Sequence, residues 1–160
     1  MAIAVGDKIP NATLMLATAN GPEKVDAATY CGSGKTALFA VPGAFSPTCS
    51  AQHLPGFVAH ADEIKAKGVD RIACVSVNDA FVMGAWGAAH GADGKVEMVA
   101  DGNGEFARAL GLTMDGAGYG MGERSQRYSA VIEDGVVKTL NVEEGGAFEA
   151  SSAERMLEQL

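Results

Sequence analysis

The sequence predicts an α/β fold in which helices flank both faces of a mixed central β-sheet. Between residues 36 and 110, short apolar runs alternate with segments of helical periodicity, as in strands joined by crossover helices. The pair Asp134-Gly135 then separates two further apolar runs and indicates an antiparallel hairpin. Parallel strands followed by a hairpin give a mixed sheet, and the helices cover its faces.

The first predicted strand and helix flank a turn that is rich in proline and hydroxyl groups. Residues 36–41 are apolar and lie between turn signals, as expected of a buried strand. Residues 49–68 carry apolar side chains at helical spacing and end at Gly68, which is typical of a helix C-terminus. Pro55 lies inside this segment and should distort the helix, because proline has no backbone N–H to donate.

The remaining elements follow from apolar runs, capping residues and glycines. The expected order is a strand at 71–77, a helix capped by Asn78 or Asp79 and ending near Gly91, a strand at 96–100, a helix at 105–110 capped by Asn103, strands at 127–133 and 136–140, and a C-terminal helix from a capping box at 151–154. Residues 111–124 are rich in glycine and are predicted to be a long loop. No repeat or linker is evident, so residues 1–160 are predicted to form one domain.

Composition limits the possible partners and locations. The chain has a formal net charge of −8 and no run of basic residues, so nucleic acid and anionic membranes should repel it. No apolar stretch reaches the length of about 18 residues that a membrane span needs. The first residues have neither the basic start nor the apolar core of a signal peptide, which predicts a cytoplasmic, reducing location.

The three cysteines have different surroundings. Cys31, Cys49 and Cys74 form no CxxC pair and no Cys/His cluster at zinc spacing, so neither a disulfide framework nor a bound metal or cofactor is expected. Cys74 lies in the middle of an apolar strand, and we interpret both Cys74 and Cys31 as buried, inert thiols. Cys49 instead follows a strand and opens a helix, where ligands bind in open α/β sheets.

Placement at a helix N-terminus favours the thiolate form of Cys49. A free cysteine has a pKa of about 8.5 and is about 3% thiolate at neutral pH, so complete ionisation gains only roughly 30-fold in rate. Further acceleration needs donors that bind the transition state, and the candidates are Ser46, the backbone N–H groups of Thr48 and Cys49, and some cation. His53, one helical turn on, either steadies the thiolate, acts as a base, or is a packed histidine with no role.

The segment around Cys49 resembles the peroxiredoxins. Residues 42–49, PGAFSPTC, fit the pattern P-x-x-x-T/S-x-x-C of that family. The continuation SAQHLPGF is similar to the type 5, or plant type II, subfamily, as are residues 75–82 with Trp86, 124–129 and 134–143. The resemblance covers essentially the whole chain and implies a thioredoxin-like fold.

The resemblance also implies an activity and roles for particular residues. A peroxiredoxin reduces hydrogen peroxide or alkyl hydroperoxides, and Cys49 would be the cysteine that becomes a sulfenic acid. Ser46 would hydrogen-bond the thiolate and the peroxide, Pro42 would shield the site from water, and Arg127 would be the cation. Arg124 is the weaker candidate for the cation. These roles predict an antioxidant enzyme with a redox-active centre.

Recycling is predicted to use an external thiol. Residues 147–160 contain no cysteine, whereas some type 5 members have a resolving cysteine near the C-terminus. We therefore expect a one-cysteine mechanism in which glutathione or glutaredoxin reduces the sulfenic acid. The alternative is recycling by thioredoxin with Cys74 or Cys31 as the resolving cysteine.

Other classes of function have less support in the sequence. A thiol–disulfide oxidoreductase would need CxxC, and a cysteine hydrolase would need a carboxylate to orient His53. A non-enzymatic redox-sensing or interaction module is supported only by Phe45 and Trp86, which look exposed. The subfamily resemblance suggests instead that these two residues mark a homodimer contact.

Overall fold

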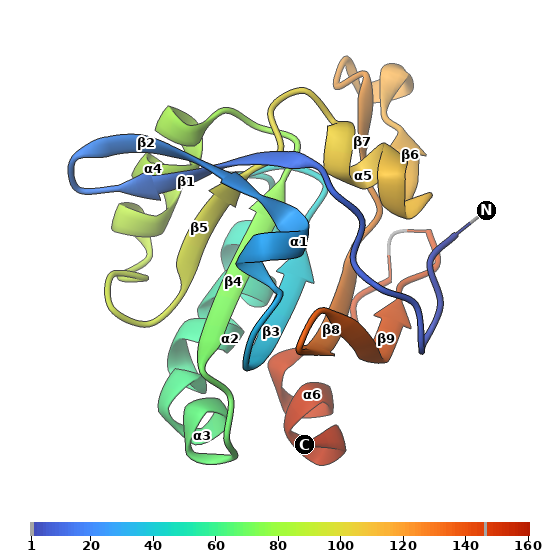
Figure 1. The fold of residues 1–160 in the computed structure, drawn as a ribbon. Coiled ribbons are helices and arrows are strands. Elements are labelled where there is room, and N and C mark those ends of the chain that lie inside the picture. Colours follow the sequence, from blue (N-terminus) through green and yellow to red (C-terminus); the bar gives the residue numbers. More distant parts are fainter. Residues whose placement is uncertain (1, 146) are drawn as a thin grey trace.

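The computed structural model describes residues 2–145 and 147–160, and its centre is a seven-stranded mixed sheet (Figure 1). The strand order is β2-β1-β5-β4-β3-β8-β9, in which β3, β4 and β5 are parallel. The strands are β1 (Thr13–Thr18), β2 (Gly21–Asp26), β3 (Lys35–Ala40), β4 (Arg71–Ser76), β5 (Glu97–Ala100), β8 (Tyr128–Glu133) and β9 (Val136–Val142). The predicted mixed sheet and its C-terminal hairpin are confirmed.

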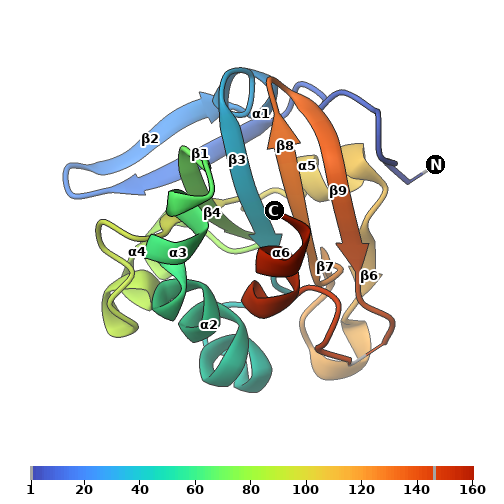
Figure 2. The same cartoon turned by 90° about the horizontal axis from the view of Figure 1, so that it is seen from below.

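Helices cover both faces of the sheet, as predicted (Figures 1 and 2). Neighbouring side chains of β3 point to opposite faces: Phe39 lies in one apolar core and Leu38 in the other. The first core is closed by α2 (Leu54–Ala59), α3 (Ala61–Ala66), α4 (Ala80–Ala89) and α6 (Ala153–Gln159), and the second by α1 (Ala27–Tyr30) and α5 (Glu105–Leu110). None of the helices in the described residues is long and apolar enough to cross a membrane. The assignment of residues 1–160 to one domain stays a prediction.

The sequence analysis missed the N-terminal hairpin of β1 and β2. These strands pair in antiparallel register from Thr13 opposite Asp26 to Thr18 opposite Gly21. β2 is the edge strand, contains a proline, and is mostly exposed or half-buried. An exposed edge strand needs no apolar alternation, and for this reason the pattern gave no signal.

The predicted continuous helix over residues 49–68 is divided into three parts. Cys49–His53 is a π-helical turn, in which the N–H of Leu54 bonds to the carbonyl of Cys49 five residues back. The expected distortion is present as the π-helical turn just before Pro55, because His53 and Leu54 both have right-handed helical backbone and α2 continues directly from that turn. α2 then ends at His60 and α3 begins on its other side.

Two further details differ from the expected elements. Residues 111–124 are not one loop, because β6 (Thr113–Asp115) pairs with β7 (Glu123–Ser125) and the two strands form a small hairpin. The C-terminal helix is capped by Ser152, whose side chain accepts from the N–H of Arg155 at 3.1 Å, and not by Ser151. α4 is capped by Asp79, as expected, through the N–H of Val82.

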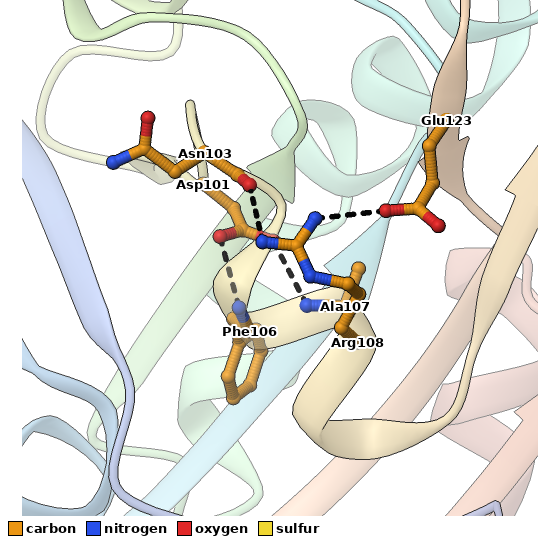
Figure 3. A network of polar contacts seen from close by, with 6 residues as sticks. All are labelled: Asp101, Asn103, Phe106, Ala107, Arg108 and Glu123. Atoms are coloured by element: carbon orange, nitrogen blue, oxygen red, sulfur yellow. Dashed lines mark hydrogen bonds and ion pairs between the residues drawn. The ribbon is translucent and has the colours of Figure 1, made fainter.

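The α5 helix begins on a buried carboxylate rather than on Asn103 (Figure 3). The side chain of Asp101 accepts from the N–H groups of Phe106 at 3.0 Å and Ala107 at 2.9 Å. Asn103 supplies only its backbone carbonyl, which accepts from Arg108 Nη2 at 2.8 Å. The residue before the helix, Gly104, has φ 71°, and this left-handed conformation favours glycine.

Arg108 joins α5 to the β6–β7 hairpin. Its Nη1 lies 2.8 Å from Oε1 of Glu123, and both side chains are about half exposed (Figure 3). Burial raises the pKa of Asp101, although the two backbone hydrogen bonds from α5 act in the opposite direction. This network is a structural connection at the carboxyl end of β5.

Candidate active site

Cys49 begins the π-helical turn just beyond the carboxyl end of β3, and its side chain is fully buried. The preceding turn is closed by two backbone bonds, from Ser46 N to the carbonyl of Gly43 at 3.3 Å and from Ser50 N to the carbonyl of Ser46 at 2.9 Å. Phe45 has φ 64°, a left-handed conformation that is costly for a residue with a side chain. Such strain is common at functional turns.

The hydroxyl of Ser46 lies between the sulfur and a carbonyl. Its Oγ is 2.7 Å from Sγ of Cys49 and 2.6 Å from the carbonyl oxygen of Gly43. A hydroxyl has one proton, so it donates either to the carbonyl, while a thiol donates to Oγ, or to a thiolate. The same side chain can therefore serve the sulfur in both protonation states.

Arg127 supplies the cation beside the sulfur. Its Nη2 donates to Sγ of Cys49 at 3.0 Å. The sheet register explains the position: Tyr128 pairs with Ala40, so the start of β8 lies beside the end of β3. Arg124 points elsewhere and donates to the carbonyls of Val77 and Met121.

His53 is hydrogen-bonded to Arg127, and none of the hydrogen bonds recorded among the described residues joins it to the sulfur. Its Nδ1 lies 2.8 Å from Arg127 Nη1, and its Nε2 lies 2.9 Å from the carbonyl oxygen of Ser151. The ring is fully buried and packs against Phe39 and Phe148, with ring centroids 4.8 Å and 5.0 Å away. Burial and then the charge of Arg127 lower the pKa of His53 to about 3, so the ring is neutral and is a very weak base.

The other predicted site residues surround the turn. Pro42 and Thr48 are half-buried, and Thr48 precedes the π-helical turn without a side-chain capping bond. Within the described part of the chain, the N–H groups of Thr48 and Cys49 have no recorded acceptor, so both are available as donors. Phe45 is 54% exposed.

Trp86 is fully buried, so the expectation that its side chain is exposed is wrong. Its Nε1 donates to Oγ of Ser50 at 2.9 Å, next to Cys49 in the chain. The indole lies 6.4 Å from the ring of Phe45. Trp86 therefore supports the turn that contains Cys49 from the core side.

Cys31 and Cys74 are buried free thiols, as expected. Burial raises the pKa of Cys31 to about 11, and the charge of Arg71 acts in the opposite direction. Burial also raises the pKa of Cys74 well above its ordinary value. Among the described residues, no group of three or more His, Cys, Asp or Glu side chains could hold a metal.

Sequence reasoning missed the C-terminal contribution to this site. Ser151 holds His53, the carboxylate of Glu143 holds Ser151, and the ring of Phe148 lies against His53 and 5.9 Å from the Arg127 guanidinium. The signal in the sequence for this segment was a charged residue, Glu143, directly after an apolar strand. Its partners are not neighbours of Cys49 in the sequence, so spacing alone could not connect them.

A family model and the curated relatives indicate the same family. A family model described as Redoxin matches residues 4–157. Peroxiredoxin-2E-2, chloroplastic, from Oryza sativa subsp. japonica is 57% identical over 163 residues, covering 99% of this chain and 72% of that protein. Peroxiredoxin-2E, chloroplastic, from Arabidopsis thaliana is 53% identical over 162 residues, covering 99% and 69%. The crystal structure of reduced Prx3 from Vibrio vulnificus in complex with H2O2 is 54% identical, with a TM-score of 0.94 and 98% coverage of both chains.

The predicted cytoplasmic location is wrong by this comparison. Both plant relatives are named as chloroplastic proteins, which contradicts the expectation. That expectation depended on the composition of a few N-terminal residues, and their composition does not determine the compartment in which a protein works.

Proposed function

Since the chain belongs to the peroxiredoxins of the Redoxin family and is a thiol-dependent peroxidase with a thioredoxin-like fold, we propose that Cys49 is the residue that reduces the peroxide. One observation carries this proposal. Two donors, Ser46 Oγ at 2.7 Å and Arg127 Nη2 at 3.0 Å, converge on the Cys49 sulfur. Neither Cys31 nor Cys74 has such contacts among the recorded hydrogen bonds of the described residues.

The proposed reaction is a nucleophilic displacement on oxygen. The Cys49 thiolate attacks the terminal oxygen of the peroxide, an S–O bond forms, and the O–O bond breaks. The leaving oxygen takes a proton and departs as water or an alcohol, and the sulfur remains as a sulfenic acid. Negative charge moves from sulfur to the leaving oxygen during this step, so fixed donors stabilise the transition state.

The surroundings of the sulfur fit a peroxide substrate. Ser46 and Arg127 donate to the sulfur, and the N–H groups of Thr48 and Cys49 remain for the peroxide oxygens. The sulfur is fully buried, which favours a small substrate and excludes most water. In this proposal the half-buried Pro42 covers one side of the site, and His53 acts through Arg127 rather than as a base.

For recycling we propose a one-cysteine mechanism with glutathione or glutaredoxin as the reductant. The raised pKa values of Cys31 and Cys74 support it, because a resolving cysteine must ionise to attack the sulfenic acid. Thioredoxin is the second candidate reductant. A homodimer is also proposed, and the exposed ring of Phe45 supports a contact there.

The experiment that tests this function compares reductants and cysteine variants. Hydrogen peroxide consumption is measured with glutathione, glutaredoxin or thioredoxin, for the wild type, Cys49→Ser and the double variant Cys31→Ser/Cys74→Ser. We expect no turnover from Cys49→Ser and full turnover from the double variant with glutathione and glutaredoxin. Activity in Cys49→Ser would overturn the role of Cys49. If the double variant reduces one equivalent of peroxide but does not turn over, the one-cysteine mechanism is wrong.

A further inference from the structure

Arg127 is held at its backbone and at its guanidinium by one connected group of residues. The backbone N–H of Glu143 donates to the carbonyl of Arg127 at 2.9 Å. At the other end, Arg127 Nη1 is bonded to Nδ1 of His53 at 2.8 Å. With both ends fixed, Nη2 is directed at the sulfur of Cys49.

The C-terminal segment determines which nitrogen of His53 carries the proton. Nε2 faces the carbonyl oxygen of Ser151, which can only accept, so Nε2 is the protonated nitrogen. The neutral ring then has its lone pair at Nδ1, where it accepts from Arg127. Arg127 cannot lose a proton in a protein, so the direction of this bond is fixed.

Glu143 holds the segment that orients His53. Its carboxylate accepts from the N–H of Ser151 at 2.8 Å, the hydroxyl of Ser151 at 2.6 Å and the N–H of Glu149 at 2.8 Å. Burial alone would raise the pKa of Glu143, but these hydrogen bonds outweigh it and lower the pKa, so the group is a carboxylate. The contacts form a closed ring: Glu143 fixes the backbone of Arg127 and, through Ser151 and His53, its guanidinium.

A neutral acceptor has an electrostatic advantage at this position. A carboxylate in place of His53 would offset the charge of Arg127, whereas a neutral imidazole orients the guanidinium and leaves its charge to act on the sulfur. None of the ion pairs recorded among the described residues includes Arg127. The Glu143 carboxylate is used by three other donors.

We propose that His53 and Glu143 are positioning residues that aim the uncompensated charge of Arg127 at Cys49, with His53 fixed as the Nε2–H tautomer. The inference rests on the proposed role of Cys49 and extends the site to the segment of residues 143–151. Neither residue touches the substrate, and each acts through Arg127.

The rate of one round of peroxide reduction by the reduced enzyme tests the proposal. His53→Leu removes the acceptor and should lower the rate about 10²-fold, the loss typical of a misplaced catalytic group. His53→Asn places an oxygen near the position of Nδ1 and should recover most of that loss. Glu143→Gln should lower the rate about tenfold, because a neutral amide oxygen is a weaker acceptor than the carboxylate oxygen Oε2, which takes all three bonds.

Matched controls separate positioning from general damage. Glu144→Gln changes the charge of the exposed neighbouring residue, and His60→Leu makes the same substitution at a histidine outside the site. Both should retain the wild-type rate. A wild-type rate in His53→Leu, or an equal loss in His53→Asn and His53→Leu, would overturn the proposal. If Cys49→Ser kept activity, the proposed function itself would fail, which is a different result.

The tautomer provides a test that needs no variant. Long-range ¹H–¹⁵N correlation spectra of the wild type should show His53 as the Nε2–H form, unchanged from pH 8 to pH 5. A Nδ1–H form, or a titration near the ordinary histidine pKa of about 6.5, would contradict the proposal. This result is independent of whether the leucine variant folds.

Discussion

Arg108 and Arg127 both lie near the carboxyl ends of the parallel strands, and their guanidinium groups have different partners. Arg108 faces the carboxylate of Glu123 and is about half exposed. Arg127 faces the neutral ring of His53 and the sulfur of Cys49. The acceptor therefore decides whether a guanidinium serves as a structural tie or as a charge available for chemistry.

The two arginines also differ in how far away their contact partners lie along the sequence. The network around Arg108 joins α5, the turn before it and the nearby β7 strand (Figure 3). The contacts of Arg127 reach residues 74 and 78 positions away in the chain. The structural contacts of Arg108 involve residues nearby in the sequence, whereas the proposed active site depends on the tertiary fold.

Replacing each arginine in turn is the strongest test of this comparison. Arg127→Met should lower single-round peroxide reduction about 10²–10³-fold, because a donor to the transition state is lost. Arg108→Met should change that rate less than about twofold, because an exposed ion pair contributes at most about 1 kcal/mol and lies outside the site. Stopped-flow peroxide reduction measures both. Similar losses in the two variants would remove the distinction.

The two regions should also respond to pH with opposite signs. The pKa of His53, which faces Arg127 and Glu143, is about 3 in the folded protein and about 6.5 ordinarily. The unfolded chain therefore binds a proton that the folded protein does not, and the stability from His53 is present above pH 6.5 and lost as the pH falls. Between pH 6.5 and pH 5 the loss should be about 2 kcal/mol.

Asp101 should act in the opposite direction. Burial raises its pKa in the folded protein, so its contribution to stability is present below the ordinary aspartate pKa and is lost as the pH rises.

Urea unfolding from pH 4 to pH 7 measures both effects. On acidification, His53→Asn should lose less unfolding free energy than the wild type. Asp101→Asn should instead lose stability more steeply on acidification. Parallel curves for His53→Asn and the wild type would contradict the buried neutral histidine.

The smallest expected effect concerns the hydroxyl at the sulfur. Ser46→Thr keeps Oγ and adds a methyl group that restricts χ1. The hydroxyl should then lose less rotamer freedom on meeting the sulfur, worth about 0.5 kcal/mol, or roughly twofold in rate. Single-round kinetics on Ser46→Thr and Ser46→Ala measure this. A large rate increase in Ser46→Thr would mean that the freedom of the Ser46 hydroxyl limits the reaction. A large rate decrease would mean that the turn has no room for the methyl group.

Local signals predicted much of the fold and part of the site. The buried strands β3, β4 and β8 were predicted from apolar runs, and Cys49 and Ser46 from a turn before a helix. The π-helical turn could not be predicted, because helical spacing does not distinguish hydrogen bonds that span four or five residues.

Contacts between residues far apart in the chain could not be predicted from the sequence. Arg127 came only from the family resemblance. The bond between His53 and Ser151 spans 98 residues, and nothing in the local pattern of either residue indicates the other. Residues that act through a second side chain leave the weakest sequence signal.

The chain contains one tryptophan, and its indole N–H is bonded to the residue after Cys49. All tryptophan emission of the protein therefore comes from a buried ring that touches the reactive turn. Any rearrangement of that turn on oxidation alters the polarity and hydrogen bonding around the fluorophore. Tryptophan emission should therefore report the redox state of Cys49, with no label required.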